Sequence, residues 1–133
     1  MRILIVEDDI TSCTVMARFV APWAIAEVAH DGQQALQMIR ARMANNEPFD
    51  LILLDVMMPI LDGQQALAEL RQLEHSHGIQ HAYRARVVMT TALDDGTSIT
   101  AAFRMKCDAY LVKPIRQAEL HKRIEEFGFQ QSC

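Results

Sequence analysis

The sequence predicts an α/β domain with a doubly wound (βα)5 fold, in which helices cover both faces of a five-stranded parallel sheet. Three observations support this prediction. Short apolar runs alternate five times with longer segments of helical periodicity. Most of these runs are almost continuously apolar, as expected for strands that are buried on both faces. Polar residues follow the runs, where binding sites form in parallel sheets.

The first β/α units have clear local signals. Residues 3–6 form an apolar run, and residues 10–20 place apolar side chains at the spacing of one helix face. Pro22 ends this helix, because proline lacks the N–H that the helix needs. A weaker strand is predicted over residues 23–29, and its Glu27 suits the edge of a sheet.

The next units are more strongly marked. Asp31 can cap the helix that follows it, and the apolar stripe of that helix ends at Met43. Residues 51–54 form a strongly apolar predicted strand. A turn around Pro59 then leads into a third helix, whose stripe ends at Leu73.

The second half of the chain contains the remaining strands and helices. Residues 75–85 have no clear period and are predicted to form a loop with some frayed helix. Residues 87–89 predict the fourth strand, and residues 110–112 predict the fifth. The last two helices are marked by two apolar sets: Ile99, Ala102 and Phe103, then Leu120, Ile124 and Phe127.

Composition excludes several classes of protein. The 133 residues fit one domain, which we assign to residues 1–128, with a C-terminal tail at 129–133. A net charge of −4 argues against direct nucleic-acid binding. The apolar runs are too short for a membrane span or a signal peptide. Three scattered cysteines without a C-x-x-C pair indicate reduced thiols, so we expect a cytoplasmic protein without a membrane partner.

The loop histidines raise the alternative of a transition-metal site. His75, His77 and His81 lie close together in the sequence, but only Glu74 could complete a tetrahedral ligand set. Solvation therefore explains these histidines better than metal binding.

Acids, hydroxyls and an amine follow four of the predicted strands and should meet at one sheet edge. Clustered carboxylates repel one another unless positive charge joins them. One lysine cannot balance three acids, so we predict a Mg²⁺ (or Mn²⁺) ion with oxygen ligands, shared with an anion such as a phosphoryl group. The residues at these strand ends are Glu7, Asp8, Asp9, Asp55, Thr90, Thr91 and Lys113.

Four motifs, "ILIVEDD", "LILLDVMMPILDG", "VVMTTA" and "YLVKP", occur in this order, each at a predicted strand end. With them the chain, from Arg2 to about Phe127, resembles the receiver domain of two-component response regulators. The resemblance implies a flavodoxin-like sheet with strand order 2-1-3-4-5. It also implies a phosphorelay switch whose own chemistry is limited to gaining and losing a phosphoryl group.

The resemblance implies roles for individual residues. Asp55 would be the phosphoacceptor, supplied by a sensor histidine kinase or a histidine phosphotransfer protein. Thr91 would bind a phosphoryl oxygen, although Thr90 is a rival for this role, and Lys113 would pair with the phosphate. Thr91 and Tyr110 would be the switch residues. The Lys113-Pro114 bond is expected to be cis, as in relatives.

The same resemblance implies a metal site. Asp8 and Asp55 would bind the ion directly, Met57 would bind it through its backbone carbonyl oxygen, and Glu7 would act through a water molecule. Asp9 lies one position beyond the acidic pair and is left out of this set. The acidic run is also favourable as the start of a helix, an explanation compatible with metal binding.

The chain departs from the family pattern at several places. Lys106 and Cys107 stand where receivers commonly have a Gly-Ala pair, so the end of the fourth helix is expected to be shaped differently. Met57 and Leu93 flank the path of the hydrolytic water in relatives. Both are apolar and cannot orient a water, so we expect a long-lived phosphoryl-Asp55.

The resemblance implies that phosphorylation biases the surface of the fourth helix, fifth strand and fifth helix toward binding a downstream protein. No output domain follows residue 133, so output by protein contact is expected, from a monomer or a phosphorylation-dependent dimer, unless this is the front of a longer regulator. Two alternatives remain. One is a degenerate receiver that binds partners without phosphate. The other is a Mg²⁺-dependent aspartyl-phosphate hydrolase, which normally needs an acid where this chain has Met57.

Overall fold

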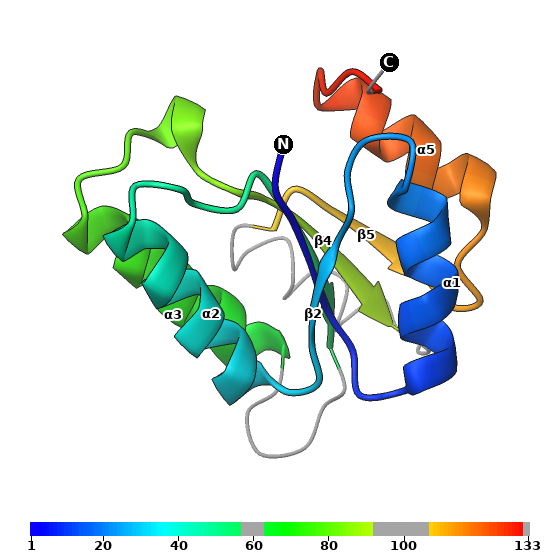
Figure 1. The fold of residues 1–133 in the computed structure, drawn as a ribbon, viewed down its shortest axis with the longest axis horizontal. Coiled ribbons are helices and arrows are strands. Elements are labelled where there is room, and N and C mark those ends of the chain that lie inside the picture. The colour runs from blue at the N-terminus through cyan, green and yellow to red at the C-terminus, as the bar shows by residue number, and fades with distance from the viewer. Residues whose placement is uncertain (57–62, 92–106, 132–133) are drawn as a thin grey trace.

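The computed structural model describes residues 1–56, 63–91 and 107–131 (Figure 1). The strands and helices in these ranges alternate along the chain, as the sequence predicts. They are β1 (Ile3–Val6), α1 (Ile10–Val20), β2 (Glu27–Ala29), α2 (Gly32–Ala44), β3 (Leu51–Asp55), α3 (Gly63–Ser76), the 3₁₀ turn η1 (His81–Tyr83), β4 (Arg86–Thr91), β5 (Ala109–Val112) and α5 (Gln117–Glu126). The fourth predicted helix, around Ile99 and Phe103, lies outside the described residues.

The five strands form one parallel sheet in the order β2-β1-β3-β4-β5, which confirms the predicted fold and strand order. Helices α1 and α5 lie on one side of this sheet, and α2 and α3 lie on the other (Figure 1). Among the described residues, no helix combines the length and the apolar character needed to cross a membrane.

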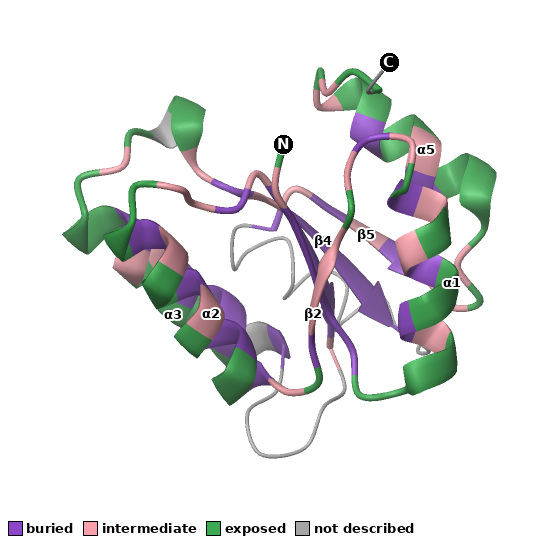
Figure 2. Ribbon diagram, viewed as in Figure 1, coloured by how far each residue is buried: buried purple, intermediate pink, exposed green. Residues whose placement is uncertain are grey.

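Apolar side chains pack into two clusters, one on each face of the sheet. Strand residues alternate between the faces, so Ile3 and Ile5 pack with α1 and α5, whereas Leu4 and Val6 pack with α2 and α3. Figure 2 shows the central strands buried along almost their whole length. Burial on both faces explains why these strands read as continuous apolar runs.

The starts of two helices are fixed by aspartate caps. The Asp9 carboxylate accepts a hydrogen bond from the Ser12 N–H at 3.1 Å, at the start of α1. Asp31 accepts one from the Gln34 N–H at 2.8 Å and caps α2, as predicted.

The edge strand β2 is shorter than the predicted strand over residues 23–29, although its edge position is confirmed. The reason lies in the turn that closes α1. The N–H groups of Trp23 and Ala24 both donate to the carbonyl oxygen of Val20, so these residues finish the helix instead of starting the strand. Trp23 is buried, and its indole N–H donates to the carbonyl oxygen of Phe129, a residue of the predicted tail.

A buried ionic network, which sequence reasoning missed, joins α3 to the residues at the starts of β4 and β5. Arg71 pairs with Glu74 at 2.7 Å and with Asp108, just before β5, at 3.1 Å. The second oxygen of Glu74 accepts the Ala85 N–H at 2.7 Å. Asp108 also pairs with Arg84 and Arg86, which completes the network.

Candidate functional site

Several of the predicted site residues lie at the carboxyl ends of the strands. Asp55 is the last residue of β3 and is only 3% exposed. Beyond it, the Val56 N–H donates to the carbonyl oxygen of Thr90 at 2.9 Å, which fixes the end of β3 against β4. Gly63 packs so closely here that a Cβ atom would collide with the carbonyl oxygen of Asp55, so only glycine fits.

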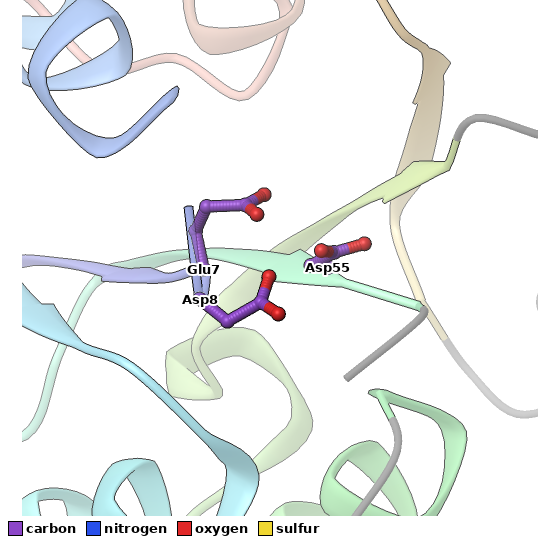
Figure 3. Close-up of side chains that lie close together, drawn as sticks. All are labelled: Glu7, Asp8 and Asp55. Carbon is purple, nitrogen blue, oxygen red and sulfur yellow. The ribbon is translucent and has the colours of Figure 1, made fainter. Parts of the chain in front are cut away.

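Three carboxylates gather at this edge. The oxygen atoms of Glu7, Asp8 and Asp55 that could bind a metal lie within 4.8 Å of one another. Figure 3 shows Glu7 and Asp8 reaching from the end of β1 toward Asp55 at the end of β3. Glu7 is 1% exposed, whereas Asp8 faces solvent. The cluster is therefore buried on one side and open on the other.

Lys113 reaches this cluster from the far side of the sheet. Its ammonium lies 2.7 Å from Oε2 of Glu7 and 3.2 Å from Oδ2 of Asp55. The Lys113 backbone N–H donates to the carbonyl oxygen of Thr91, and the bond between Lys113 and Pro114 is cis. One ammonium thus joins residues of β1 and β3 to the end of β5.

The pKa values of two groups reflect this crowding. Burial raises the pKa of Glu7, and the charge of Asp55 adds to the rise, while the hydrogen bond from Lys113 opposes it. Burial by itself would lower the pKa of Lys113, but the Glu7 hydrogen bond and the Asp55 charge outweigh it, so that pKa is raised. The ammonium is therefore held in its charged form between two carboxylates.

The donor set fits a hard divalent cation. Three carboxylates face one ammonium, so a single positive charge leaves the cluster negative. Carboxylate oxygens are the ligands that Mg²⁺ prefers. Asp9 does not belong to the cluster, because it caps α1. The Asp9 carboxylate accepts hydrogen bonds from the hydroxyl and the N–H of Ser12, and these bonds lower the pKa of the Asp9 carboxyl.

The two threonines of β4 lie on opposite faces of the sheet, because successive side chains of a strand alternate. Thr90 is in register with Asp55, and both Thr90 and Thr91 are buried. Tyr110 is partly buried and packs against the cluster on the α2 and α3 side. The positions of Met57 and Leu93 lie outside the described residues.

The loop histidines do not form a metal site in the part of the chain that the structure describes. His75 and His77 are exposed, and the His77 ring hydrogen-bonds the carbonyl oxygen of Leu73 at 2.9 Å. Both carboxylate oxygens of Glu74 are taken by Arg71 and the Ala85 N–H. The side chain of His81 is not among those that the structure describes.

A groove of about 470 Å³ opens beside Lys113 and was not anticipated from the sequence. It lies between α1 and the segment that follows β5. Val15 on its wall is 39% exposed, and Ile10 at the start of α1 is 73% exposed. Ile10 does not line the groove, so the available signal was Val15, an apolar residue outside the buried stripe of α1. The groove is lined by Thr11, Ser12, Val15, Met16, Lys113, Pro114 and Ile115.

Comparison with known sequences points to one family. Residues 3–125 match the family model described as "Response regulator receiver domain". The transcriptional regulatory protein YclJ of Bacillus subtilis is 30% identical over 126 residues, which cover 94% of this chain and 49% of that protein. The chain spans about half, or less, of the length of the curated relatives it matches first.

Solved structures of receiver domains and related proteins share the fold of this chain. One similar chain comes from the co-crystal structure of the Saccharomyces cerevisiae histidine phosphotransfer signaling protein Ypd1 with the receiver domain of its downstream response regulator Ssk1. The TM-score is 0.82 at 26% identity, over 96% of this chain and 88% of that one. A chain of the CheX-CheY-BeF3-Mg+2 complex from Borrelia burgdorferi shares the fold, with a TM-score of 0.81 at 22% identity over 98% and 90% of the two chains.

Proposed function

Because this chain belongs to the response regulator receiver domain family, whose members act as signalling switches, we propose that it accepts a phosphoryl group on Asp55 from a phosphohistidine donor. The observation that carries the proposal is the position of Asp55 at the rim of the sheet. Its carboxylate lies beside two further acids and 3.2 Å from an ammonium. The ammonium, together with a divalent cation bound by the acids, would neutralise the charge of a phosphoryl group.

In the proposed transfer, an oxygen of Asp55 attacks phosphorus as the P–N bond of the phosphohistidine breaks. The electron pair of that bond stays on the imidazole nitrogen, and the new P–O bond makes an acyl phosphate. Lys113 lies where its ammonium can bind a phosphoryl oxygen, because it already contacts Asp55. The hydroxyl of Thr91, at the end of β4, would donate a hydrogen bond to another phosphoryl oxygen, as in relatives.

We propose that the reaction depends on Mg²⁺ or Mn²⁺. Asp8 and Asp55 would hold the ion directly, Glu7 would act through a water molecule, and Met57 would contribute its backbone carbonyl oxygen. The bound cation supplies the positive charge that offsets the acids and the incoming phosphoryl oxygens. The fit of the three carboxylates to such an ion supports this assignment.

The donor is proposed to be a sensor histidine kinase or a histidine phosphotransfer protein. The groove beside α1 supports this, because its apolar wall opens next to Lys113, at the edge that holds Asp55. A helix that carries the donor histidine could pack its apolar face there and bring the phosphoryl group to Asp55. The phosphotransfer protein Ypd1 is such a partner in the solved complex with Ssk1.

The readout is proposed to be a change of surface. Thr91 and Tyr110 would rearrange on phosphorylation and bias the face formed by the fourth helix, β5 and α5 toward a downstream protein. The receiver is assigned to residues 1–128 and the tail to 129–133, in a cytoplasmic protein that is a monomer or a phosphorylation-dependent dimer. Its own chemistry would be limited to gaining and losing phosphate.

The test is incubation with acetyl phosphate and Mg²⁺, followed by intact mass measurement. Wild type should gain one phosphoryl group, while Asp55→Asn, which keeps the shape but removes the nucleophilic carboxylate, should gain none. Replacing Mg²⁺ with EDTA should abolish the gain. No modification of wild type would favour the degenerate receiver, and turnover of a phosphate ester would favour the hydrolase.

A further inference from the structure

The hydroxyl of Thr90 is a buried polar group that the proposed chemistry does not use. Thr90 is 1% exposed, and its Oγ1 atom has no hydrogen-bond partner among the described residues. A buried hydroxyl without a partner loses its hydration and gains nothing in return. Valine has the same shape and would avoid this loss, so the resting form alone gives no physical reason for a threonine here.

The position of Thr90 on β4 places this hydroxyl next to the strand that carries Asp55. Thr90 is in register with Asp55 on the neighbouring strand, and such strands lie only about 4.8 Å apart. Two residues earlier, Leu53 and Val88 both pack in the cluster on the α1 and α5 side. By alternation, Asp55 and Thr90 share that face, so their side chains are direct lateral neighbours.

The side chain of Lys113 reaches across the sheet edge near Thr90. This lysine follows β5, yet its ammonium contacts Asp55 on β3 and Glu7 just after β1. Since β4 lies between β5 and β3, the side chain of Lys113 must cross the end of β4 to reach them. The apolar stem of the lysine therefore passes near the strand end that carries Thr90.

We propose that Thr90 is a positioning residue whose hydroxyl donates a hydrogen bond to the Asp55 carboxyl group only when Asp55 is phosphorylated. In the resting form, Lys113 holds Oδ2 of Asp55. A phosphoryl group brings new anionic oxygens that draw the ammonium toward them. The Asp55 oxygen that Lys113 releases keeps a lone pair beside the one that would bind the cation, and a turn about the χ1 angle of Thr90 brings a hydroxyl that can donate to it.

This arrangement biases the switch toward its phosphorylated form. The hydroxyl has no hydrogen bond in the resting form and gains one in the phosphorylated form. The free energy of that hydrogen bond therefore favours the phosphorylated form. The inference rests on the proposed phosphorylation of Asp55. It differs from the role given to Thr91, whose side chain lies on the other face of β4.

The test compares Thr90→Val with Thr90→Ser, using beryllofluoride and Mg²⁺. The beryllium of this ion bonds to a carboxylate oxygen and stands in for the phosphoryl group, so affinity is measured without a transfer step. Thr90→Val should bind beryllofluoride about fivefold more weakly than wild type, as expected for one lost hydrogen bond. Thr90→Ser, which keeps the donor, should retain most of the wild-type affinity.

A second readout is the melting temperature without beryllofluoride. Thr90→Val should melt at the wild-type temperature or above it, because it removes an unsatisfied group. The matched control Thr14→Val removes a hydroxyl on the exposed side of α1 and should leave beryllofluoride affinity unchanged.

Three outcomes would overturn the inference. Equal affinity in wild type and Thr90→Val would show that the hydroxyl gains no bond in the occupied state. A lower melting temperature for ligand-free Thr90→Val would show that the hydroxyl already has a partner at rest. Failure of wild type to bind beryllofluoride and to gain mass from acetyl phosphate would remove the proposed function and this inference with it.

Discussion

The ammonium of Lys113 lies 2.7 Å from the carboxylate of Glu7, although 106 positions separate the two residues in the chain. Glu7 follows β1 and Lys113 follows β5, so this pair spans the inner strands of the sheet. Its hydrogen bond opposes the rise in the pKa of Glu7 that burial and the charge of Asp55 cause. The stability of the domain and the charge of its site therefore depend on the same contact.

Lys113→Met should destabilise the ligand-free protein. The substitution keeps an unbranched side chain but leaves Glu7, which is almost fully buried, beside Asp55 without a cation. We expect the free energy of unfolding to fall by about 2 kcal/mol, less than for a fully buried pair because Lys113 is partly exposed. Urea unfolding in EDTA measures it. The control Lys122→Met changes an exposed lysine, and an equal loss there would contradict the prediction.

Mg²⁺ should raise the melting temperature of wild type in a concentration-dependent way, because a ligand that binds only the folded state stabilises it. Asp8→Asn should lose most of this rise, since it removes one of the three clustered carboxylates. Asp9→Asn is the matched control one residue along. It keeps an oxygen to cap α1, so its response to Mg²⁺ should match that of wild type. Similar responses from the two variants would exclude the assigned ligand set.

Asp108→Asn should lower the free energy of unfolding by about 2–4 kcal/mol. The carboxylate of Asp108 pairs with Arg71, Arg84 and Arg86 and accepts the Val87 N–H at 2.8 Å. Neutralising it removes the negative charge that these three partly buried guanidinium groups share. Chemical denaturation tests the prediction.

The control for Asp108 is a surface ion pair. Glu126→Gln breaks the pair with Arg123 at 3.2 Å, in which both side chains are nearly half exposed. Exposed pairs contribute little, so this variant should unfold almost as wild type does. If both variants behave alike, the network before β5 is not a stabilising feature.

Stability should fall as the pH rises from about 9 to about 11. Burial raises the pKa of the Cys107 thiol from its ordinary 9.0 to about 11, so in this window the unfolded chain releases a proton that the folded protein keeps. Proton release then favours unfolding, by an amount on the order of 2 kcal/mol across the window. Below pH 9 the stabilisation is fully present. Cys107→Ala should show a shallower decline, and an unchanged slope would contradict this assignment.

Phosphoryl-Asp55 is expected to be long-lived, because the apolar Met57 and Leu93 cannot orient an attacking water. Met57→Asn adds a polar group at one of these positions and should shorten the lifetime severalfold. The decay of the phosphorylated mass after removal of the donor measures it. Rapid loss in wild type that Met57→Asn leaves unchanged would argue against this prediction.

Local sequence signals predicted much of the fold. The apolar runs that became β1 and β3 and the cap of α2 at Asp31 depend on neighbours within a few positions. The edge strand was predicted too long, because the residues after Val20 had an alternative local hydrogen bond that closes a turn. Strand ends are decided by such competition, which a pattern of residue types does not resolve.

The candidate site was predictable where topology alone brings residues together. Parallel strands end at one edge, so the acids after β1 and β3 and the lysine after β5 had to converge. The lone hydroxyl of Thr90 was not predictable in this way. Which of two adjacent threonines shares the face of Asp55 depends on the register between β3 and β4.

The sequence by itself determined the alternation of strands and helices and the set of acids, hydroxyls and amine at the strand ends, because these follow from periodicity and chain order. Tertiary structure decided which groups touch. Lys113 pairs with Glu7, and Asp108 pairs with three arginines. A groove lies beside α1, and the Thr90 hydroxyl is buried beside Asp55. Such contacts join residues far apart in the chain. Their distances depend on sheet register and side-chain packing, which no local pattern encodes.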